Sequence, residues 1–397
     1  MMHPLFSSRD TLMDEIWLPP FELETTPLSQ NKVAFLTGVT GFIGGYTLLQ
    51  LLETGVFTKL YCLVRGETED IRKKKLKQSI KQKGGRYEDV ADRLEVVPGD
   101  IFQPRFGLPG HTYDRLCEEV DQVFHFAGSM NWVRGFGPEA RMNIQALREA
   151  ISMAASGKTK VLHYASSMGA WSTLNPEPNP ILENELHQNP ESLPGGYCQL
   201  KWVNEKICQL ARERGLPLLA YRIGDVKGHS ITGHSDLANF GNLVMGHMLK
   251  TDLVPMGKTR FNFIPVDYVA QTVTRIAENP KPFLGQTFQF NNPESIGWED
   301  FSSTLMSLKR KPRAVPFSEW WASLEPKTLS CRALRAVFRP FTPHQSSPPV
   351  SFFDIGTALY LRHHDDKNTR IALADSEIRC PRMLSDGILM RYLTQGI

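Results

Sequence analysis

The stretch Val33-Ala34-Phe35-Leu36-Thr37-Gly38-Val39-Thr40-Gly41-Phe42-Ile43-Gly44 determines the fold of this chain. Its first four residues are apolar, which predicts a buried strand, and residues 46–52 have the apolar density of a packed helix. Between strand and helix, Gly38, Gly41 and Gly44 allow the backbone to turn tightly and to approach an anion at the helix N-terminus. In this context the G-x-x-G-x-x-G spacing predicts a seat for the pyrophosphate of a dinucleotide.

Beyond this stretch, short apolar runs recur along the chain and alternate with longer amphipathic stretches. They lie at residues 33–37, 59–64, 94–97, 121–126, 160–165 and 217–222. This alternation is typical of βαβ units, so we predict an α/β fold with a doubly wound parallel Rossmann sheet.

The chain is too long, at 397 residues, for one minimal core, and the strand pattern stops near Gly224. We therefore expect an irregular N-terminal lead-in over residues 1–30, a dinucleotide-binding domain over 31–225, and a smaller, mainly helical substrate domain after it. Residues 338–350 are expected to be an extended connection, and residues 381–393 a closing helix.

Composition narrows the class of protein. Hydrophobic residues make up 41% and charged residues 22%, as in soluble globular proteins, and the formal net charge of +3 requires no particular partner. The basic tract 72–83 lacks interleaved aromatic residues, so no nucleic acid is expected. Without a signal peptide or a run of about 18 apolar residues, no membrane span is expected either.

The cysteines and histidines indicate neither a disulfide framework nor a metal. The six cysteines are scattered with no C-x-x-C pair, which fits a reduced, cytoplasmic protein, and we expect a monomer. The run His363-His364-Asp365-Asp366 is interpreted as a solvated loop, because adjacent side chains rarely converge on one ion.

Three residues bear on which dinucleotide would bind. A chain that binds NAD commonly has an acid at the end of the second strand, but this chain has Arg65, which can take a 2′-phosphate bidentately. NADP is therefore favoured. Lys75 would add a second cation if its helix folds back over the adenine side. Asp100, after the third strand candidate, would contact the adenine or simply cap a turn.

Tyr197 and Lys201 are four residues apart and share a face if their segment is helical. The ammonium is then expected to lower the pKa of the phenol and to bond a nicotinamide ribose, making Tyr197 a proton donor to a carbonyl. Ser167, after the strand candidate at 160–165, would hold the oxyanion beside it. A surface tyrosine beside a lysine, and a serine that only caps a turn, are the plain alternatives.

Further motifs accompany these residues: Cys62-Leu63-Val64-Arg65, Val96-Val97-Pro98-Gly99-Asp100, Asn131-Trp132, the run from Gly195 to Glu205, the run from Gly228 to Gly233, and Pro265-Val266-Asp267-Tyr268-Val269-Ala270. In this combination the chain resembles the extended short-chain dehydrogenase/reductases. Within them it is similar to the thioester reductase domains that terminate nonribosomal peptide synthetases, polyketide synthases, carboxylic acid reductases and aminoadipate reductases. The resemblance runs from about Lys32 to Phe290 and continues weakly to the C-terminus.

The resemblance implies NADPH-dependent reduction of an acyl thioester, held on the phosphopantetheine arm of an acyl carrier protein, to an aldehyde and possibly onward to an alcohol. It implies catalysis by Ser167, Tyr197 and Lys201. It also implies that residues 261–292 return to the first domain, which leaves 226–260 and 293–397 as the substrate and carrier-binding domain. The residues expected at the cofactor are Gly38, Thr40, Gly41, Phe42, Ile43, Gly44, Arg65, Lys75, Asp100, Ile101, Ala127, Gly128, Asn143, Tyr197, Lys201, Ile223, Gly224 and Val226.

Two other functions remain open from the sequence. One is an acyl-CoA reductase or a hydroxysteroid-type dehydrogenase on the same fold. The other is a dinucleotide-sensing protein without turnover, although such a protein has no need of the serine, tyrosine and lysine together.

Overall fold

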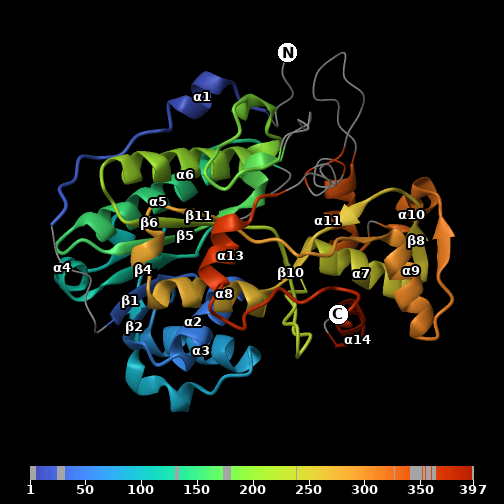
Figure 1. Cartoon of the computed structure of the whole chain (residues 1–397), viewed down its shortest axis with the longest axis horizontal. Coiled ribbons are helices and arrows are strands. Elements are labelled where there is room, and N and C mark those ends of the chain that lie inside the picture. Colours follow the sequence, from blue (N-terminus) through green and yellow to red (C-terminus); the bar gives the residue numbers. More distant parts are fainter. Residues whose placement is uncertain are drawn as a thin grey trace.

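The computed structural model describes residues 6–24, 32–129, 134–172, 180–237, 239–325, 327–339, 351, 354, 359 and 364–395. Figure 1 shows a larger lobe, built around a sheet with helices on both faces, and a smaller lobe beside it that contains α7, α9, α10 and α11. Within the described residues, no helix combines the length and the apolar character needed to cross a bilayer.

Seven parallel strands form the central sheet, in the order β11-β6-β5-β4-β1-β2-β3. Their bounds are Lys32–Thr37 (β1), Phe57–Val64 (β2), Leu94–Pro98 (β3), Gln122–His125 (β4), Val161–Ser167 (β5), Leu218–Ile223 (β6) and Thr287–Gln289 (β11). All six predicted strands are present, and the predicted doubly wound sheet is confirmed. Because β1 pairs with both β2 and β4, the strand order reverses there, which is where such folds bind ligands.

Side chains alternate between the two faces of the sheet, and each face packs against its own helices. Phe35 packs on the face covered by α4 (Gly110–Glu119), α5 (Pro138–Ala155) and α6 (Gly195–Glu213). Its neighbours Ala34 and Leu36 pack on the opposite face, which is covered by α2 (Phe42–Glu53), α3 (Glu69–Gln82), α8 (Val266–Glu278) and α13 (Lys367–Leu373). Burial on both faces explains why the strands are continuous apolar runs.

The smaller lobe has its own core, in which Trp320 is fully buried. It contains α7 (Phe240–Thr251), α9 (Trp298–Ser307), α10 (Phe317–Ser323), α11 (Leu329–Phe338) and α14 (Ile388–Gln395). Three short strand pairs lie outside the main sheet: β7 (Asp225–Lys227) with β10 (Phe263–Pro265), β8 (Leu253–Pro255) with β13 (Arg313–Val315), and β9 (Arg260–Phe261) with β12 (Ile296–Gly297).

Three local expectations need correction. The closing helix begins at Ile388 and not at 381, because Gly387 has a left-handed φ of 68° and the Asp386 carboxylate accepts the Arg382 amide in a preceding turn. The predicted connection at 338–350 starts later, since α11 continues to Phe338, and residues 340–350 lie outside the described residues. The lead-in contains a short helix, α1 (Arg9–Met13).

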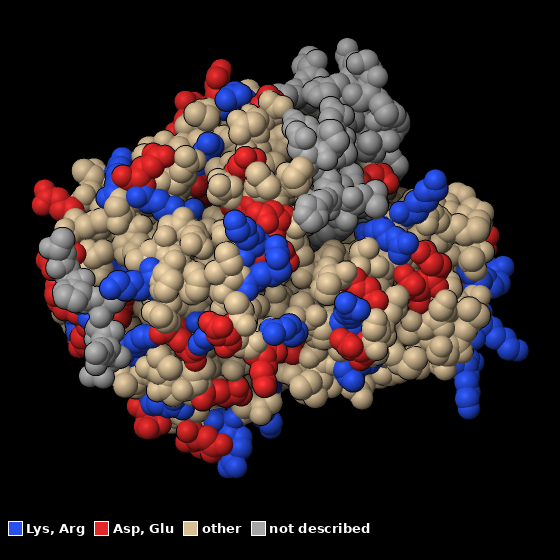
Figure 2. Space-filling view, in the orientation of Figure 1, with Lys and Arg blue, Asp and Glu red and all other residues tan. Residues whose placement is uncertain are grey.

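The lead-in is held against the sheet lobe by arginines. Arg148 of α5 donates to the Glu15 carbonyl at 2.7 Å, and Arg214 donates to the Pro19 carbonyl at 2.9 Å. On the face seen in Figure 2, positive and negative side chains of the described residues are interspersed. Mixed signs of this kind do not build up the long-range field of one sign that steers a strongly charged partner.

Candidate active site

The glycine turn between β1 and α2 has no room for side chains. Gly38 has a φ of 82°, and a Cβ there would lie 2.7 Å from the Ala127 amide nitrogen. A Cβ on Gly44 would lie 2.4 Å from the Gly38 carbonyl oxygen. The fold therefore requires glycine at both positions for the first turn of α2 to pack against the end of β1.

The N-terminus of α2 is suited to an anion. Gly41 is its N-cap and supplies no side-chain hydrogen bond, so the first-turn amides, which include those of Phe42 and Ile43, have no side-chain cap. Thr40 lies in the turn just before them. Uncapped amides and the helix dipole favour a phosphate group at this point, and the Cβ-free surface lets it approach the backbone. The residues present therefore fit a dinucleotide pyrophosphate.

The predicted adenosine side lies at the ends of β2 and β3. Arg65 follows β2 with its side chain 68% exposed, and its Nη1 lies 3.7 Å from Asp100 Oδ2. Lys75 of α3 folds back so that its Nζ donates to the Arg65 carbonyl at 2.9 Å. Asp100 also accepts the Phe102 amide at 3.1 Å, so it closes a turn as well as pairing with Arg65. Ile101 is buried beside it.

The end of β4 packs against the glycine turn. Thr37 Oγ1 lies 3.1 Å from His125 Nδ1 and accepts the Ala127 amide at 3.2 Å. One residue on, a Cβ at Gly128 would lie 3.2 Å from Asn143 Oδ1.

Asn143 of α5 fixes the segment after β4. Its Oδ1 accepts the Ser129 amide at 2.8 Å and its Nδ2 donates to the Glu139 carbonyl at 2.8 Å. Asn143 is therefore a support of this segment, which passes beside the predicted cofactor site.

The strand register brings the carboxyl ends of β1, β4, β5 and β6 to one edge. Thr37 pairs with His125, His125 with Tyr164, and Ser167 with Ile223. Gly224 then links β6 to β7, in which Val226 pairs with Ile264. Ile223, Gly224 and Val226 thus continue from the strand next to Ser167 toward the smaller lobe.

Ser167 and Tyr197 are in contact, although 30 positions separate them in the sequence. The Gly169 amide donates to Ser167 Oγ at 3.0 Å, and the Ser167 hydroxyl hydrogen-bonds the Tyr197 hydroxyl. Space is tight, since a Cβ at Gly169 would lie 3.2 Å from Tyr197 Cε1.

The start of α6 places Tyr197. Gly195 has a φ of 70°, and the Gly196 amide donates to the Arg134 carbonyl at 2.6 Å. A Cβ at Gly196 would lie 2.4 Å from the Gly135 carbonyl oxygen. The two glycines thus let the segment around Arg134 cross the helix N-terminus directly before the tyrosine.

The protonation of Tyr197 differs from the expectation. Burial raises the pKa of Tyr197 to about 12, and the hydrogen bond from Ser167 only partly opposes this. Desolvation of the phenolate therefore outweighs any help from Lys201, which was expected to lower that pKa. The phenol is neutral at pH 7 and retains the proton that a donor needs.

Lys201 lies one helical turn beyond Tyr197. Its Nζ donates to the Ala165 carbonyl at 2.7 Å and lies 5.8 Å from the centroid of the Tyr197 ring. Burial lowers the pKa of Lys201 to about 8, while Glu205 and Cys208 oppose the shift. Most of the population is still an ammonium at pH 7.

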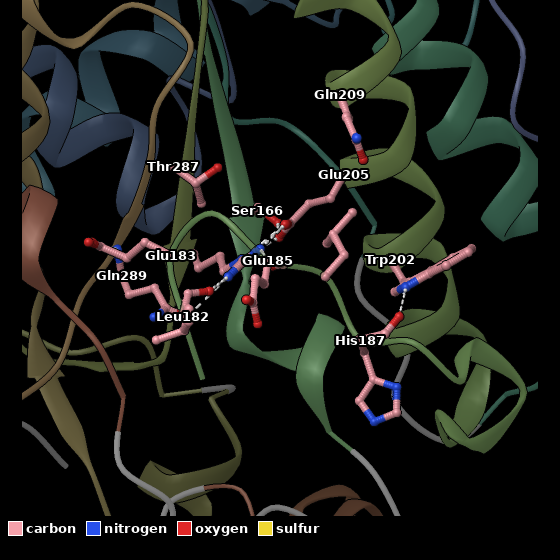
Figure 3. A network of polar contacts seen from close by, with 12 residues as sticks. Ser166, Leu182, Glu183, Glu185, His187, Trp202, Glu205, Gln209, Thr287 and Gln289 are labelled. Carbon is pink, nitrogen blue, oxygen red and sulfur yellow. Dashed lines mark hydrogen bonds and ion pairs between the residues drawn. The ribbon is translucent and has the colours of Figure 1, made fainter. Parts of the chain in front are cut away.

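A second set of buried groups, not assigned a role from the sequence, fixes α6 to the sheet. Arg222 of β6 donates to both Glu205 carboxylate oxygens, at 3.1 and 2.9 Å from Nε and at 2.7 Å from Nη2, and Ser166 donates to the same carboxylate. Figure 3 shows Glu205 reaching from its helix toward Ser166. A fully buried arginine within an apolar strand was the available signal, because a buried charge needs a partner.

The same network holds the segment that precedes α6. Arg222 also donates to the Leu182 carbonyl at 2.9 Å and to the Glu185 carbonyl, and Trp202 Nε1 donates to the His187 carbonyl at 2.8 Å (Figure 3). The helix that carries Tyr197 and Lys201 is therefore locked both to the sheet and to this segment.

Among the described residues, no group of three or more His, Cys, Asp or Glu side chains is arranged to hold a metal ion. His364, from the run interpreted as a loop, instead contacts the Leu359 carbonyl at 2.9 Å and Asn291 at 3.0 Å. His363 lies outside the described residues.

The chain matches a known protein family over more than half of its length. An NAD-binding family model described as "Male sterility protein" matches residues 36–273, which include the glycine turn and the Ser167, Tyr197 and Lys201 positions.

Curated relatives are much longer than this chain. A linear gramicidin synthase of Brevibacillus parabrevis is 27% identical over 381 residues, which cover 94% of this chain but 7% of the relative. The large subunit of L-2-aminoadipate reductase of Penicillium chrysogenum is 28% identical over 310 residues, covering 75% of this chain and 22% of the relative. The chain thus corresponds to a part of these proteins.

Solved structures match over nearly the whole length. The terminal R domain from the myxalamid PKS-NRPS biosynthetic pathway has a TM-score of 0.84 and 26% identity, covering 97% of this chain and 96% of that one. A thiolation-reductase di-domain from an archaeal non-ribosomal peptide synthetase has a TM-score of 0.73 at 18% identity, covering 96% of this chain and 78% of that one, a likeness of fold.

Proposed function

This chain belongs to the NAD-binding family described as "Male sterility protein", and on this basis we propose that it is an NADPH-dependent thioester reductase. Its substrate would be an acyl group, peptidyl or polyketidyl, bound as a thioester to an acyl carrier protein, and its product the free aldehyde. The observation that carries the proposal is that Ser167, Tyr197 and Lys201 lie together at the sheet edge that also carries the glycine turn.

Ser167 and Tyr197 would stabilise the charge that develops on the thioester oxygen. Because the Ser167 oxygen accepts the Gly169 amide at 3.0 Å, its own proton is directed outward as a donor. The neutral phenol of Tyr197 supplies a second donor and then the proton itself. Both donors are in place before the substrate arrives, which is the condition for stabilising a transition state.

Lys201 would bond the nicotinamide ribose while its positive charge stabilises the Tyr197 phenolate after proton transfer. NADPH, when bound, supplies the hydride to the thioester carbonyl carbon. Collapse of the resulting hemithioacetal breaks the carbon–sulfur bond, leaving an aldehyde and the carrier thiol. Whether the aldehyde is reduced again to an alcohol would depend on how long it stays in the site.

NADPH is proposed over NADH because two cations meet at the end of β2. The exposed Arg65 guanidinium and the Lys75 ammonium, which donates to the Arg65 carbonyl, would both face a 2′-phosphate. Asp100 is 3.7 Å from Arg65 and would turn that guanidinium toward the ribose.

A carrier protein is the proposed partner, and the named relatives support it. One similar structure pairs a reductase with a thiolation domain, and the linear gramicidin relative is a synthase. In this arrangement residues 31–225 with 261–292 would bind the cofactor, and residues 226–260 with 293–397 would receive the acyl chain and its carrier.

The proposal is tested by following NADPH oxidation with a panel of carrier-bound thioesters, CoA thioesters and free alcohols, and by identifying the products. Aldehyde formed from a carrier-bound thioester, with Tyr197→Phe as the inactive control, is the expected result. Faster turnover of CoA thioesters would indicate an acyl-CoA reductase, and of alcohols a hydroxysteroid-type dehydrogenase. NADPH binding without oxidation on any substrate would indicate a dinucleotide sensor.

A further inference from the structure

Lysine is a flexible side chain, and Lys201 can serve a cofactor only if something fixes its ammonium. Within the described residues, Nζ donates to two acceptors: the Ala165 carbonyl at 2.7 Å and the Tyr164 hydroxyl at 3.3 Å. The ammonium also lies 5.0 Å from the centroid of the Tyr164 ring, closer than to the ring of Tyr197. An ammonium has three protons, so these two bonds leave one for a ligand.

Tyr164 is itself held rigidly. Its side chain is 3% exposed, and its oxygen accepts a hydrogen bond from Asn204 Nδ2 at 2.8 Å. Its ring stacks on His125, with centroids 6.2 Å apart and planes 16° from parallel.

Strand geometry explains why Tyr164 is in this position. Side chains on β5 alternate, so Tyr164 and Ser166 point to the face covered by α6, where they meet Asn204 and Glu205. Lys201 of the same helix, one turn before Glu205, then reaches back over the strand to the Ala165 carbonyl.

We propose that Tyr164, held by Asn204, is a positioning residue that fixes the Lys201 ammonium so that its third proton points at the nicotinamide ribose. This inference rests on the proposed function for the role of Lys201. Tyr164 touches neither cofactor nor substrate in this proposal and acts only through the lysine. Fixing the side chain in advance removes the entropy that binding would otherwise cost.

The charged and titratable neighbours of Lys201 make Tyr164 the group to vary. His125 of β4 has its pKa lowered to about 3 by burial and by Lys201, so it is neutral. Glu205 is committed to Arg222, and burial raises the pKa of the Cys208 thiol to about 12. Tyr197 is likewise a neutral phenol. The Tyr164 oxygen therefore provides a neutral but oriented acceptor for the ammonium.

The test is a double-mutant cycle on NADPH binding, measured by titration calorimetry with the intact chain. Tyr164→Phe is expected to weaken NADPH binding about tenfold, the scale of one hydrogen bond to a charged group. In a Lys201→Met background the same change is expected to have no further effect, because its target is gone. Asn204→Ala should weaken binding in the same direction by less.

Tyr221→Phe is the matched control. Tyr221 is a buried strand tyrosine whose hydroxyl lies 2.7 Å from His163 Nδ1 and away from Lys201, so its loss should leave NADPH binding unchanged. An equal effect of Tyr164→Phe with and without Lys201, or an equal loss in Tyr221→Phe, would overturn the inference.

The cycle separates this inference from the proposed function, since it needs binding and not turnover. Where thioesters are reduced, the alkaline limb of the kcat profile should move to lower pH in Tyr164→Phe, because the ammonium loses an acceptor. A chain that binds NADPH but reduces no thioester would fail the proposed function while the cycle still decides the role of Tyr164.

Discussion

Among single residues, the chemistry depends most on a phenol that burial keeps protonated. Tyr197 has its pKa raised to about 12, and Ser167 is the polar group that contacts its hydroxyl. Acid catalysis by a positioned side chain contributes typically about a hundredfold to ten-thousandfold in rate. Loss of the one proton should therefore be visible in turnover and not in cofactor binding.

We predict that Tyr197→Phe lowers kcat by about a hundredfold or more while the NADPH dissociation constant changes little. The ribose contact proposed for Lys201 remains in this variant. Steady-state kinetics and calorimetry on the same preparation check both halves of the prediction. Turnover equal to that of the unmodified chain would remove Tyr197 from the mechanism.

The second prediction for a single residue concerns Arg65. Arg65→Ala should weaken NADPH binding about tenfold or more and NADH binding far less, because only NADPH carries the 2′-phosphate. Competitive binding of the two nucleotides measures the ratio.

Arg86→Ala is the control for lost charge in the Arg65 experiment. The Arg86 side chain is 76% exposed and its Nε pairs with Asp89 at 3.7 Å, much as Arg65 pairs with Asp100. Equal losses for both nucleotides in Arg65→Ala would mean that this guanidinium does not meet the phosphate.

Among the helices, strands and turns, the turn into α2 is the most constrained part of the site. A methyl group at Gly44 would lie 2.4 Å from a backbone oxygen, which cannot move as a flexible side chain would. Accommodating it must shift the first turn of α2 away from β1, and with it the amides available to a phosphate.

Gly44→Ala is predicted to weaken NADPH binding at least tenfold and to lower the free energy of unfolding by about 1–3 kcal/mol, the range for overpacking. Urea denaturation and calorimetry measure the two effects. Gly110→Ala is the control, since a Cβ there meets nothing within 4 Å. If Gly44→Ala behaved like Gly110→Ala, the tight turn would not be needed for binding.

The elements themselves were largely predictable from the sequence. The apolar runs indicated all six predicted strands because a strand buried on both faces must be continuously apolar. The start of α14 was not predictable in this way, since a turn fixed by Asp386 and Gly387 looks helical in its apolar spacing.

Across the whole molecule, a buried carboxylate joins three segments that are far apart in the sequence. Glu183 accepts the Gln289 amide of β11 at 2.9 Å and the Asn368 amide of α13 at 2.6 Å, and Thr369 Oγ1 lies 3.3 Å away. It thus ties the segment before α6 to the edge of the sheet and to the C-terminal part of the chain (Figure 3 shows Glu183 beside Gln289).

This contact predicts a pH dependence of stability. Burial raises the pKa of Glu183 from 4.5 to about 7, so the folded chain favours the protonated acid more than the unfolded chain does. The contribution of this group to stability is then fully present below about pH 4.5 and is lost as the pH rises through about 7.

The check is the melting temperature of the unmodified chain and of Glu183→Gln across that interval. The variant is expected to be less stable throughout, because its amide group opposes a backbone N–H, but it should lack the component of the slope due to Glu183. Identical slopes would show that Glu183 does not titrate there.

Local sequence was sufficient to specify the strand–turn–helix that begins the fold, the alternation that continues it, and the residue types at the site. Such features depend on neighbours within a few positions, where steric and hydrophobic preferences act directly. Tertiary packing alone established which distant groups meet and what burial does to them. It brought Tyr164 to Lys201, Arg222 to Glu205 and Glu183 to α13, and it raised the pKa of Tyr197 where the spacing alone had predicted a fall. The physical reason is that desolvation belongs to the packed interior and has no signature in the local sequence.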